Sequence, residues 1–498
     1  GRAAWRMWKE HRLYGDLRAS GKPVVVVGAG TGGAMLVREL ERSPDWRVVA
    51  LVDDAQQKWG LELYGRPVAG AIDNLPDVLT DYKAQHVILA MPSAASDARR
   101  RAADLAAQAG AHVFTVPGLE DLMNGKVAIN TMRPVEIEDL LGREVVQIDT
   151  AHVQGMIAGK TVLITGAGGS IGSELCRQLS RFGPARLVFY ESNEFALYTI
   201  EQWFSQNRPA LAVLALTGDV KDAVRLDEVF ASCRPDLVFH AAAYKHVPLM
   251  EVGNAWQAVR NNVLGTLCVG EQAIRHGVER FVLISTDKAV NPTNVMGATK
   301  RLAEMVCEAL QRSTSARTQF EIVRFGNVLG STGSVIPKFR EQIASGGPVT
   351  VTHPEINRYF MSIPEAAQLV LQAAAMGQGG EIFVLDMGEP VKIVDLARKM
   401  IRLSGYTEDE IRIEFTGLRP GEKLYEELLS DSEHTRETPH PKLRIAQSRE
   451  VESHLLTTLR ELFDGTPCMS DDEVRNTLRS FVPEYQPADH ERTVEVTA

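Results

Sequence analysis

The chain of 498 residues is acidic, with 64 aspartates and glutamates against 54 lysines and arginines and a net charge of −10. Its length and its 44% apolar residues allow two or three domains with full cores, and its charge argues against a general nucleic-acid binder. The five cysteines are scattered and odd in number, which predicts reduced thiols and neither a disulfide framework nor a metal site.

Residues 1–22 form a basic segment, with six lysines and arginines against two acidic residues. Nowhere do 18 apolar residues follow one another, so no membrane span or signal peptide is predicted. A short basic segment is typical of the cytoplasmic side of a membrane helix and equally of a solvated N-terminal helix, and charge alone leaves both open. The chain begins with glycine rather than methionine, which indicates a sequence cut from a longer one.

Residues 23–117 are predicted to form a first Rossmann-like domain. The β-branched run 23–28 leads into the glycine-rich turn 28–33 and then into a periodic helix, and further strands are expected at 48–52, 86–90 and 112–116. Asp53, after the second of these strands, has the placement of a carboxylate that binds an adenosine ribose. Two interpretations stay open: a bound dinucleotide or CoA-like ligand, or glycines kept only for packing.

Residues 118–159 lack long periodic runs and are predicted to connect this domain to a second α/β unit over 160–484. A buried-strand run at 161–165 precedes a second glycine string, and an amphipathic helix follows it. The spacing of Gly166, Gly169 and Gly172 lets backbone N–H groups, including those of Ser170 and Ile171, approach a pyrophosphate.

The strands that follow predict the rest of a dinucleotide site. Glu191 ends the strand 186–190, and its carboxylate suits a ribose 2′-hydroxyl but repels a 2′-phosphate, which favours NAD over NADP. Asp219 and Val220 suit the adenine edge, and Ala241 and Ala242 are small enough to let a dinucleotide lie close.

The segment 285–300 has the layout of a short-chain dehydrogenase active site without its tyrosine. Met296 stands where the phenol is expected, and Lys300, four residues later on the same helix face, is placed to hold the nicotinamide ribose. A thioether has no proton to exchange, so Asp287 and Lys288 at the end of the preceding strand are the candidate acid and base.

Four motifs carry a family resemblance: Thr-Gly-Ala-Gly-Gly-Ser-Ile-Gly-Ser-Glu from Thr165, Ala-Ala-Ala-Tyr-Lys-His-Val-Pro-Leu-Met-Glu from Ala241, Ser-Thr-Asp-Lys from Ser285 through Met-Gly-Ala-Thr-Lys, and Arg-Pro-Gly-Glu-Lys from Arg419. Over residues 23–450 the chain resembles the long, membrane-associated nucleotide-sugar 4,6-dehydratases, which are extended short-chain dehydrogenases/reductases similar to UDP-N-acetylglucosamine 4,6-dehydratase. That family serves capsule, O-antigen and protein-glycan synthesis. The resemblance implies upstream membrane helices that would place the enzyme at the cytoplasmic face of the bacterial inner membrane.

The resemblance also implies an activity. Relatives that keep the tyrosine invert C5 of the sugar, so Met296 points to a hydro-lyase that retains C5 and makes UDP-2-acetamido-2,6-dideoxy-D-xylo-hexos-4-ulose. The alternatives are a C5-inverting dehydratase, a nucleotide-sugar 4-epimerase, and a non-enzymatic NAD-binding sensor or scaffold. A homodimer, or a higher homo-oligomer, is implied through the helices with apolar faces at 256–267 and 296–310.

Each catalytic side chain has a predicted role. Lys288 is the base at C5 and Asp287 the acid toward the C6 hydroxyl, while burial and a direct ion pair shift their pKa values in opposite senses, so their resting states stay open. Thr286 is the candidate relay for the C4-hydroxyl proton. Met296 is expected to pack against the sugar or the nicotinamide.

The downstream region supplies cations for the diphosphate of a UDP-sugar. Arg358 and Arg419 are nominated because an arginine fork matches phosphate oxygens, with Asn327 and Lys338 nearby and Glu422 on the nucleoside ribose. Lys245, after the fourth strand, is predicted to face the substrate. Residues 485–498 are predicted to be a disordered tail.

Overall fold

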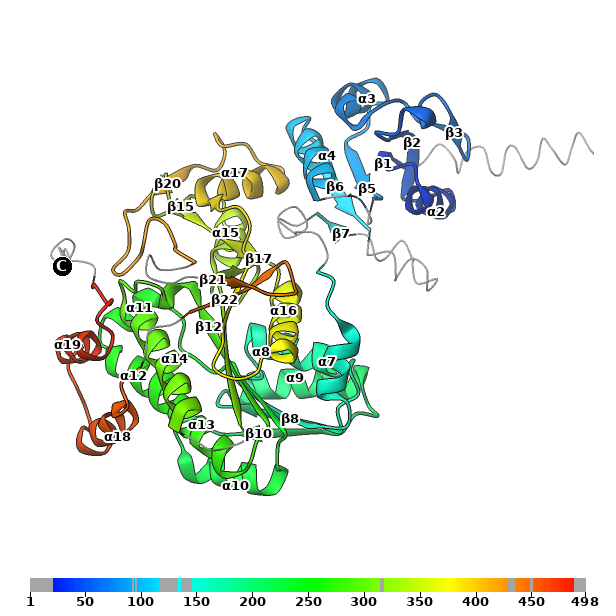
Figure 1. Ribbon diagram of the computed structural model, residues 1–498. Helices are drawn as coiled ribbons and strands as arrows, with labels where there is room; N and C mark the ends of the chain where they lie inside the picture. The colour runs from blue at the N-terminus through cyan, green and yellow to red at the C-terminus, as the bar shows by residue number, and fades with distance from the viewer. Residues whose placement is uncertain are drawn as a thin grey trace, which may run out of the picture. The chain divides into compact units, whose positions relative to one another are not determined.

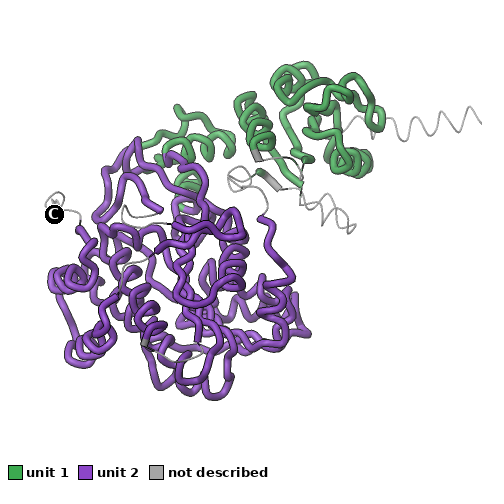
Figure 2. The backbone as a smooth tube through the Cα atoms, viewed as in Figure 1, with its two compact units in different colours: residues 1–144, 338–350, 394–414 green, residues 145–337, 351–393, 415–498 purple. Residues whose placement is uncertain are grey.

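The computed structural model describes residues 21–91, 94, 96–116, 133–135, 146–313, 318–428, 435–447 and 451–487. The chain divides into two compact units, unit 1 with residues 1–144, 338–350 and 394–414, and unit 2 with residues 145–337, 351–393 and 415–498 (Figure 2). Residues 1–20 of the predicted basic segment, most of the predicted connection 118–159 and the tail from residue 488 lie outside the described residues. The predicted domain boundaries therefore stay a prediction.

Unit 1 contains a five-stranded sheet in the order β2-β1-β5-β6-β7. Its strands are β1 (Lys22–Val27), β2 (Trp46–Val52), β5 (His86–Leu89), β6 (His112–Thr115) and β7 (Arg133–Pro134), of which only β7 runs antiparallel to its neighbour. The four strands predicted from the sequence are confirmed. Val24 to Val27 are fully buried, as expected for a strand covered on both faces.

The other elements of unit 1 are helical or short: α2 (Thr31–Leu40), η2 (Gln56–Lys58), β3 (Glu62–Leu63), β4 (Arg66–Pro67), η3 (Ile72–Asn74), α3 (Leu75–Asp81) and α4 (Ser96–Gln108). The later segments of this unit carry most of α15 (Val335–Ala344), β15 (Val349–Val351), α17 (Ile393–Leu403) and β20 (Ile413–Phe415). Asp53 accepts hydrogen bonds from the N–H of Ala29 (2.7 Å) and of Ala55 (2.9 Å) and pairs with Lys58 (2.8 Å). The carboxylate is therefore tied to the glycine-rich turn.

Unit 2 contains a nine-stranded sheet in the order β10-β9-β8-β11-β12-β13-β18-β22-β21 (Figure 1). Its strands are β8 (Thr161–Thr165), β9 (Arg186–Glu191), β10 (Val213–Thr217), β11 (Leu237–His240), β12 (Arg280–Thr286), β13 (Gln319–Phe325), β18 (Ile382–Leu385), β21 (Thr435–Glu437) and β22 (Leu443–Ala446). The strands from β10 to β18 are parallel, and β22 and β21 add antiparallel pairs. The strand order reverses between β8 and β11, which is where open α/β sheets bind ligands.

Helices cover both faces of this sheet (Figure 1). One face is packed by α10 (Ala223–Cys233), α11 (Val247–Glu251), α12 (Ala255–Val259), η5 (Arg260–Leu264), α13 (Gly265–Arg275), α14 (Val295–Ser313), α18 (Leu455–Gly465) and α19 (Asp471–Phe481). The other is packed by α7 (Thr150–Ile157), α8 (Ser170–Leu179), α9 (Glu194–Asn207) and α16 (Ile363–Met376). Successive residues of β12 alternate between the two cores, with Phe281 and Leu283 in one and Val282 in the other.

Small elements lie beyond the carboxyl edge of the sheet: η6 (Asp287–Ala289), the pair β14 (Asn327–Val328) and β17 (Phe360–Met361), and the pair β16 (Asn357–Arg358) and β19 (Val391–Lys392). Among the described residues no helix is long and apolar enough to cross a membrane.

The helices predicted for a dimer interface are covered within the chain. Trp256, Val259 and Val263 are at most 4% exposed, and the Trp256 indole N–H donates to the carbonyl of Pro467 (3.2 Å). Helices α18 and α19 contact α14, and α19 also contacts α12. These faces are therefore not free to pair with a second copy in this arrangement, and homodimerisation stays a prediction without this interface.

Candidate active site

The predicted catalytic residues lie together at the carboxyl edge of the sheet. Strand β12 ends at Thr286, and Asp287 and Lys288 begin the short helix η6. The Thr286 hydroxyl donates to Asp287 Oδ1 (2.9 Å) and accepts the Lys288 N–H (3.4 Å). The three residues thus form one hydrogen-bonded unit on the side of the sheet where α/β enzymes bind their ligands.

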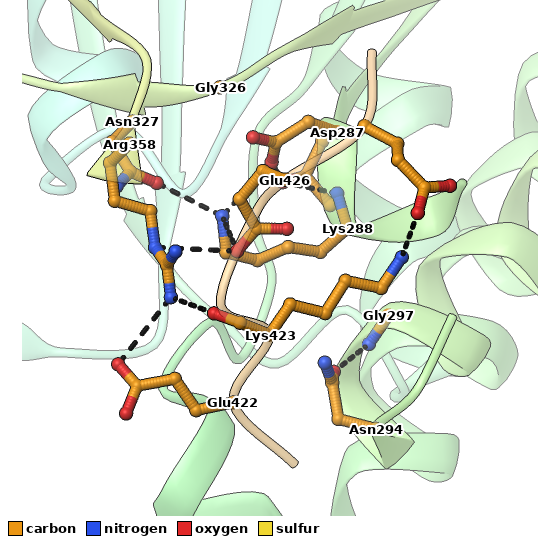
Figure 3. A network of polar contacts seen from close by, with 12 residues as sticks. Asp287, Lys288, Asn294, Gly297, Gly326, Asn327, Arg358, Glu422, Lys423 and Glu426 are labelled. Atoms are coloured by element: carbon orange, nitrogen blue, oxygen red, sulfur yellow. Dashed lines mark hydrogen bonds and ion pairs between the residues drawn. The ribbon is translucent and has the colours of Figure 1, made fainter. Parts of the chain in front are cut away.

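The amine of Lys288 is surrounded by oxygens (Figure 3). Its Nζ lies 3.0 Å from Asp287 Oδ1, 3.0 Å from Asn327 Oδ1 and 3.4 Å from Glu426 Oε1. Burial lowers the pKa of Lys288, but the carboxylates of Asp287 and Glu426 outweigh it, so the net pKa is raised. This direction favours the charged form of Lys288 in its ion pair with Asp287.

The second oxygen of Asp287 is differently placed. Oδ2 is buried and has no hydrogen-bond partner within the described part of the chain. A Cβ at Gly326 would lie 3.0 Å from it, so the glycine keeps the space beside this oxygen open. An unpaired buried carboxylate oxygen costs free energy, and a substrate hydroxyl hydrogen-bonded there would remove that cost.

Met296 and Lys300 both lie in the first two turns of helix α14. Met296 is 3% exposed and belongs to the core, in place of the phenol of related sites. The Lys300 amine donates to the carbonyl of Ile284 on β12 (2.7 Å), and burial lowers its pKa to about 8, although Glu304 opposes the shift. Its predicted role on the ribose stays a prediction.

Gly297 lets helix α14 approach the turn of residues 286–288, which is called the catalytic turn after its predicted role. A Cβ there would lie 2.1 Å from the carbonyl oxygen of Lys288, and the Gly297 N–H donates to Asn294 Oδ1 (2.7 Å; Figure 3). The start of α14 is further fixed by Glu251, whose Oε1 accepts the Val295 N–H (2.6 Å). The glycine after Met296 is thus a packing requirement of the site.

We expect Gly297→Ala to lower the free energy of unfolding by about 1–3 kcal/mol, because the added methyl collides with backbone rather than with a flexible side chain. Urea denaturation measures it. The matched control is Gly155→Ala in α7, where a Cβ meets nothing within 4 Å; that helical change should leave stability unchanged or slightly raised. Equal stability of both variants would contradict the packing argument.

A buried ion network holds β12 against α14. The Ser285 hydroxyl donates to Glu304 Oε1 (2.6 Å), and Arg324 donates to both oxygens of Glu304 (2.8 and 2.7 Å). Arg301 reaches Glu304 Oε2 at 3.1 Å. The network lies directly under the catalytic turn and couples its position to the helix.

The predicted glycine turn lies at the reversal of strand order, between β8 and β11. Gly166 has φ +66°, and a Cβ there would lie 2.7 Å from the nitrogen of Ala242 and 2.9 Å from the carbonyl carbon of Ala241. A Cβ at Gly172 would lie 2.0 Å from the Gly166 oxygen. The missing side chains therefore let strand, turn and helix meet closely.

The N-terminus of α8 follows this turn. The Gly169 N–H donates to the Gly166 oxygen (3.0 Å), and the helix begins with Ser170 and Ile171. Free N–H groups in the first turn of a helix are suited to a pyrophosphate. The turn therefore fits the dinucleotide predicted from the sequence.

Glu191 is anchored at the end of β9. Its Oε2 accepts the Gly168 N–H (3.1 Å) and its Oε1 the Asn193 N–H (3.0 Å). This fixes a negative charge beside the glycine turn, where it would repel a 2′-phosphate.

Asp219 and Val220, the residues predicted for the adenine edge, follow strand β10. Asp219 Oδ1 accepts from the N–H of Lys221 (2.9 Å) and pairs with its amine (2.8 Å). Burial raises the pKa of Asp219, but these contacts outweigh it and hold the pKa below its usual value. Val220 is buried, and a Cβ at Gly265 of α13 would lie 2.7 Å from it.

Arg358 and Arg419, the residues nominated for the diphosphate, both pair with Glu422, the residue nominated for the ribose. Arg419 lies 2.9 Å from Glu422 Oε1 and Arg358 lies 3.5 Å from the same oxygen. Burial raises the pKa of Glu422, but Arg419 outweighs it and the net pKa is lowered. The sequence nominated these three residues for separate substrate contacts, and the fold shows that one carboxylate pairs with both cations.

Arg358 also anchors the segment 419–428 (Figure 3). It donates to the carbonyls of Asn357 (2.6 Å), Lys423 (2.8 Å) and Leu424 (3.3 Å). A phosphate contact by this arginine would require the segment to move, so its predicted role on phosphate stays a prediction.

The remaining residues predicted to bind the substrate are Asn327, Lys245 and Lys338. Asn327 contacts Lys288 rather than the arginines. Lys245 is exposed in the loop between β11 and α11, and Lys338 is exposed on α15 in unit 1. Sequence reasoning missed Glu426, because no motif marks it and only the fold brings it to Lys288. Within the part of the chain that is described, no group of three or more metal-binding side chains forms a metal site.

A parallel sheet with a glycine turn at its order reversal, and a lysine on the helix that follows the strand-end Asp-Lys pair, agrees with the fold of short-chain dehydrogenases/reductases. The chain belongs to the polysaccharide biosynthesis protein family, whose model matches residues 162–448. The predicted polysaccharide biosynthesis family and the predicted fold class are confirmed, and membrane association stays a prediction.

Similar proteins extend this result. The chain is 49% identical over 438 residues to a capsular polysaccharide biosynthesis protein CapD of Staphylococcus aureus, covering 87% of this chain and 72% of that protein. Shorter matches cover 56% of this chain and 80% of each relative: 36% identity over 285 residues to a UDP-glucose 4-epimerase of Rickettsia rickettsii, and 32% over 281 residues to an inverting UDP-N-acetylglucosamine 4,6-dehydratase of Campylobacter jejuni.

Among solved structures, Pen from Bacillus thuringiensis is similar, with a TM-score of 0.54 and 34% identity over 60% of this chain and 90% of that one. The curated relatives include nucleotide-sugar dehydratases and epimerases, and the chain is a member of that broad group.

Proposed function

We propose that the chain is an NAD-dependent 4,6-dehydratase that converts UDP-N-acetylglucosamine to UDP-2-acetamido-2,6-dideoxy-D-xylo-hexos-4-ulose with C5 retained. The observation that carries the proposal is the Asp287–Lys288 pair, hydrogen-bonded to Thr286, beside a helix whose phenol position is Met296. A paired acid and base at this edge suit an elimination, whereas simple oxidation and reduction at C4 needs neither a base at C5 nor an acid at the C6 hydroxyl.

These residues can account for every proton that the reaction transfers. Bound at the glycine turn, NAD would supply a temporary hydride store between C4 and C6. Thr286 passes the C4-hydroxyl proton to Asp287, to which it is hydrogen-bonded at 2.9 Å. Neutral Lys288 takes the C5 proton while Asp287 gives its proton to the C6 hydroxyl, which leaves as water. The Lys288 ammonium then returns a proton to C5, so both side chains end as they began.

The proposed cycle starts with Lys288 neutral, whereas the ion pair favours its charged form. Loss of the proton from Lys288, whose pKa is raised, should therefore form the acid limb of the pH–activity profile. Activity should rise with pH as the lysine loses its proton.

The direct experiment is to incubate the protein with UDP-N-acetylglucosamine and to examine the product by mass spectrometry and NMR. Loss of one water with the C5 configuration kept is expected. The C5 epimer would instead establish the inverting reaction. An isomer of unchanged mass would establish a 4-epimerase, which the similarity to the Rickettsia enzyme favours as second candidate. No conversion would favour an NAD-binding sensor or scaffold.

Glu191 predicts which cofactor copurifies. We expect the protein to release NAD rather than NADP on denaturation, because the fixed carboxylate repels a 2′-phosphate and because recycling within each turnover favours tight binding. Chromatography of the released nucleotide measures this. Recovery of mainly NADP would overturn the Glu191 argument.

The proposed setting rests on the family resemblance. It is the cytoplasmic face of the bacterial inner membrane, with a UDP-sugar substrate, a homodimeric or larger assembly, and a product that enters capsule, O-antigen or protein-glycan synthesis. Fractionation of cells that express the full-length protein tests the location.

A further inference from the structure

Glu426 lies between the two cations of the site (Figure 3). Its Oε1 is 3.4 Å from Lys288 Nζ and 3.5 Å from Arg358 Nε, and its side chain is 4% exposed. A carboxylate this deeply buried is unfavourable unless it is paired. Its partners, Lys288 and Arg358, both belong to the candidate active site, so the position of Glu426 affects the setting of the Lys288 amine.

The segment that carries Glu426 is fixed to the catalytic turn. The Lys423 amine donates to the carbonyl of Val290 (3.2 Å), and the Asn294 amide donates to the carbonyl of Gly421 (3.1 Å). Residues 290–294 directly follow the turn with Lys288 and lead into α14. The glutamate therefore approaches the amine from an anchored backbone and not from a loose surface loop.

An ammonium has three N–H donors, and three oxygens surround the amine of Lys288. They come from Asp287 on the same turn, Asn327 on β14 and Glu426 on the segment 419–428. The charged groups that face it are the carboxylates of Asp287 and Glu426 and the guanidinium of Arg358 on β16. Asp287 exchanges its proton in the proposed reaction, which leaves Glu426 as the constant negative charge.

We propose that Glu426 is a positioning residue for Lys288: it holds the amine beside Asn327 and stabilises the ammonium that forms when Lys288 takes the C5 proton. The inference rests on the proposed function. The carboxylate favours the transfer of the proton to nitrogen, because it lies close to the charge that develops there. Glu426 takes no part in the proton transfers of the proposed cycle, and Arg358 Nε lies 3.5 Å from its Oε1.

The test is Glu426→Gln, which keeps the shape and removes the charge. Two opposite effects are expected from one cause. The acid limb of the kcat profile should move to lower pH by about one unit, since Lys288 loses a neighbour that favours its charged form. The plateau of kcat should fall by up to about tenfold, the rate equivalent of one pKa unit, since the ammonium that forms is less stabilised, while KM changes little. Glu426→Asp should recover part of the plateau.

The matched control is Glu427→Gln. Glu427 is exposed and contacts Asn291 (2.6 Å) and Lys423 (3.6 Å), so both the limb and the plateau should stay as in the wild type. A merely structural role of Glu426 would lower activity without moving the limb. A pH profile of Glu426→Gln that superimposes on the wild type would overturn the inference.

A second measurement separates this inference from the proposed function. The rate at which acetic anhydride labels Lys288, followed by peptide mass spectrometry over a pH series, reports the titration of that amine without turnover. The midpoint should fall in Glu426→Gln and not in Glu427→Gln. A lowered midpoint together with no loss of water from UDP-N-acetylglucosamine would keep the inference and reject the dehydratase. An unchanged midpoint would reject the inference even for an active dehydratase.

Discussion

Lys288→Ala should lower turnover of UDP-N-acetylglucosamine by about 100–10,000-fold, the usual loss when a general base is removed. The side chain is 17% exposed and its amine is held among three oxygens, and alanine offers no group there that could take the C5 proton. Oxidation at C4 breaks a different bond. The variant should therefore still form bound NADH, seen by its absorbance, without releasing water.

The control for this variant is Lys392→Ala, which removes an exposed lysine that pairs with Glu355 at 2.8 Å. Its turnover should equal that of the wild type. In deuterated water the wild-type product should carry deuterium at C5, while the hydrogen moved from C4 to C6 should stay protium. Near-normal turnover of Lys288→Ala would remove Lys288 from the mechanism.

The features that the sequence predicted are local in the chain. The run 161–165 is apolar and β-branched because its strand is covered on both faces, and a glycine turn is recognisable because a Cβ at Gly172 has no room. Asp287 and Lys288 follow their strand directly, so their place at the carboxyl edge comes with the strand. Patterns of this kind need no knowledge of distant contacts.

The features that the sequence could not predict join distant segments. Glu426 meets Lys288, and Glu422 holds both Arg358 and Arg419, only because the segment 419–428 docks on the turn after Lys288. No spacing encodes such a contact. The apolar faces offered for a dimer were likewise recognised correctly as buried, but their partners are α18 and α19 of the same chain.

The catalytic turn also depends on an ion network that no motif revealed, and Glu304→Gln should test it with a large loss of stability. Glu304 is fully buried and accepts from Ser285 and from both ends of the Arg324 fork. Removing its charge takes the carboxylate away from the buried Arg324, while Arg301 keeps its two other carboxylates, and breaking a buried pair in this way costs about 3–5 kcal/mol. The urea midpoint at neutral pH measures the effect.

A surface pair supplies the control. Glu271→Gln removes the partner of Arg460, and both side chains are more than one-third exposed, so the expected loss is below about 1 kcal/mol. If both variants lost the same small amount, the network would be no more than another surface pair, and the position of β12 against α14 would need another explanation.

The pH dependence gives the same prediction a second, independent check. Burial raises the pKa of Glu304, but Arg324, Arg301 and Ser285 outweigh it, so the pKa in the folded state lies below its usual value of 4.5. A carboxyl whose pKa is lowered by folding contributes stability that is complete above that value and is lost as the pH falls through the folded pKa. Wild type and Glu304→Gln should therefore differ most at neutral pH, and their urea midpoints should converge below pH 4.5 as the wild-type carboxylate takes up its proton. A difference that persists unchanged into acid would show that the charge of Glu304 is not what holds the strand and the catalytic helix together.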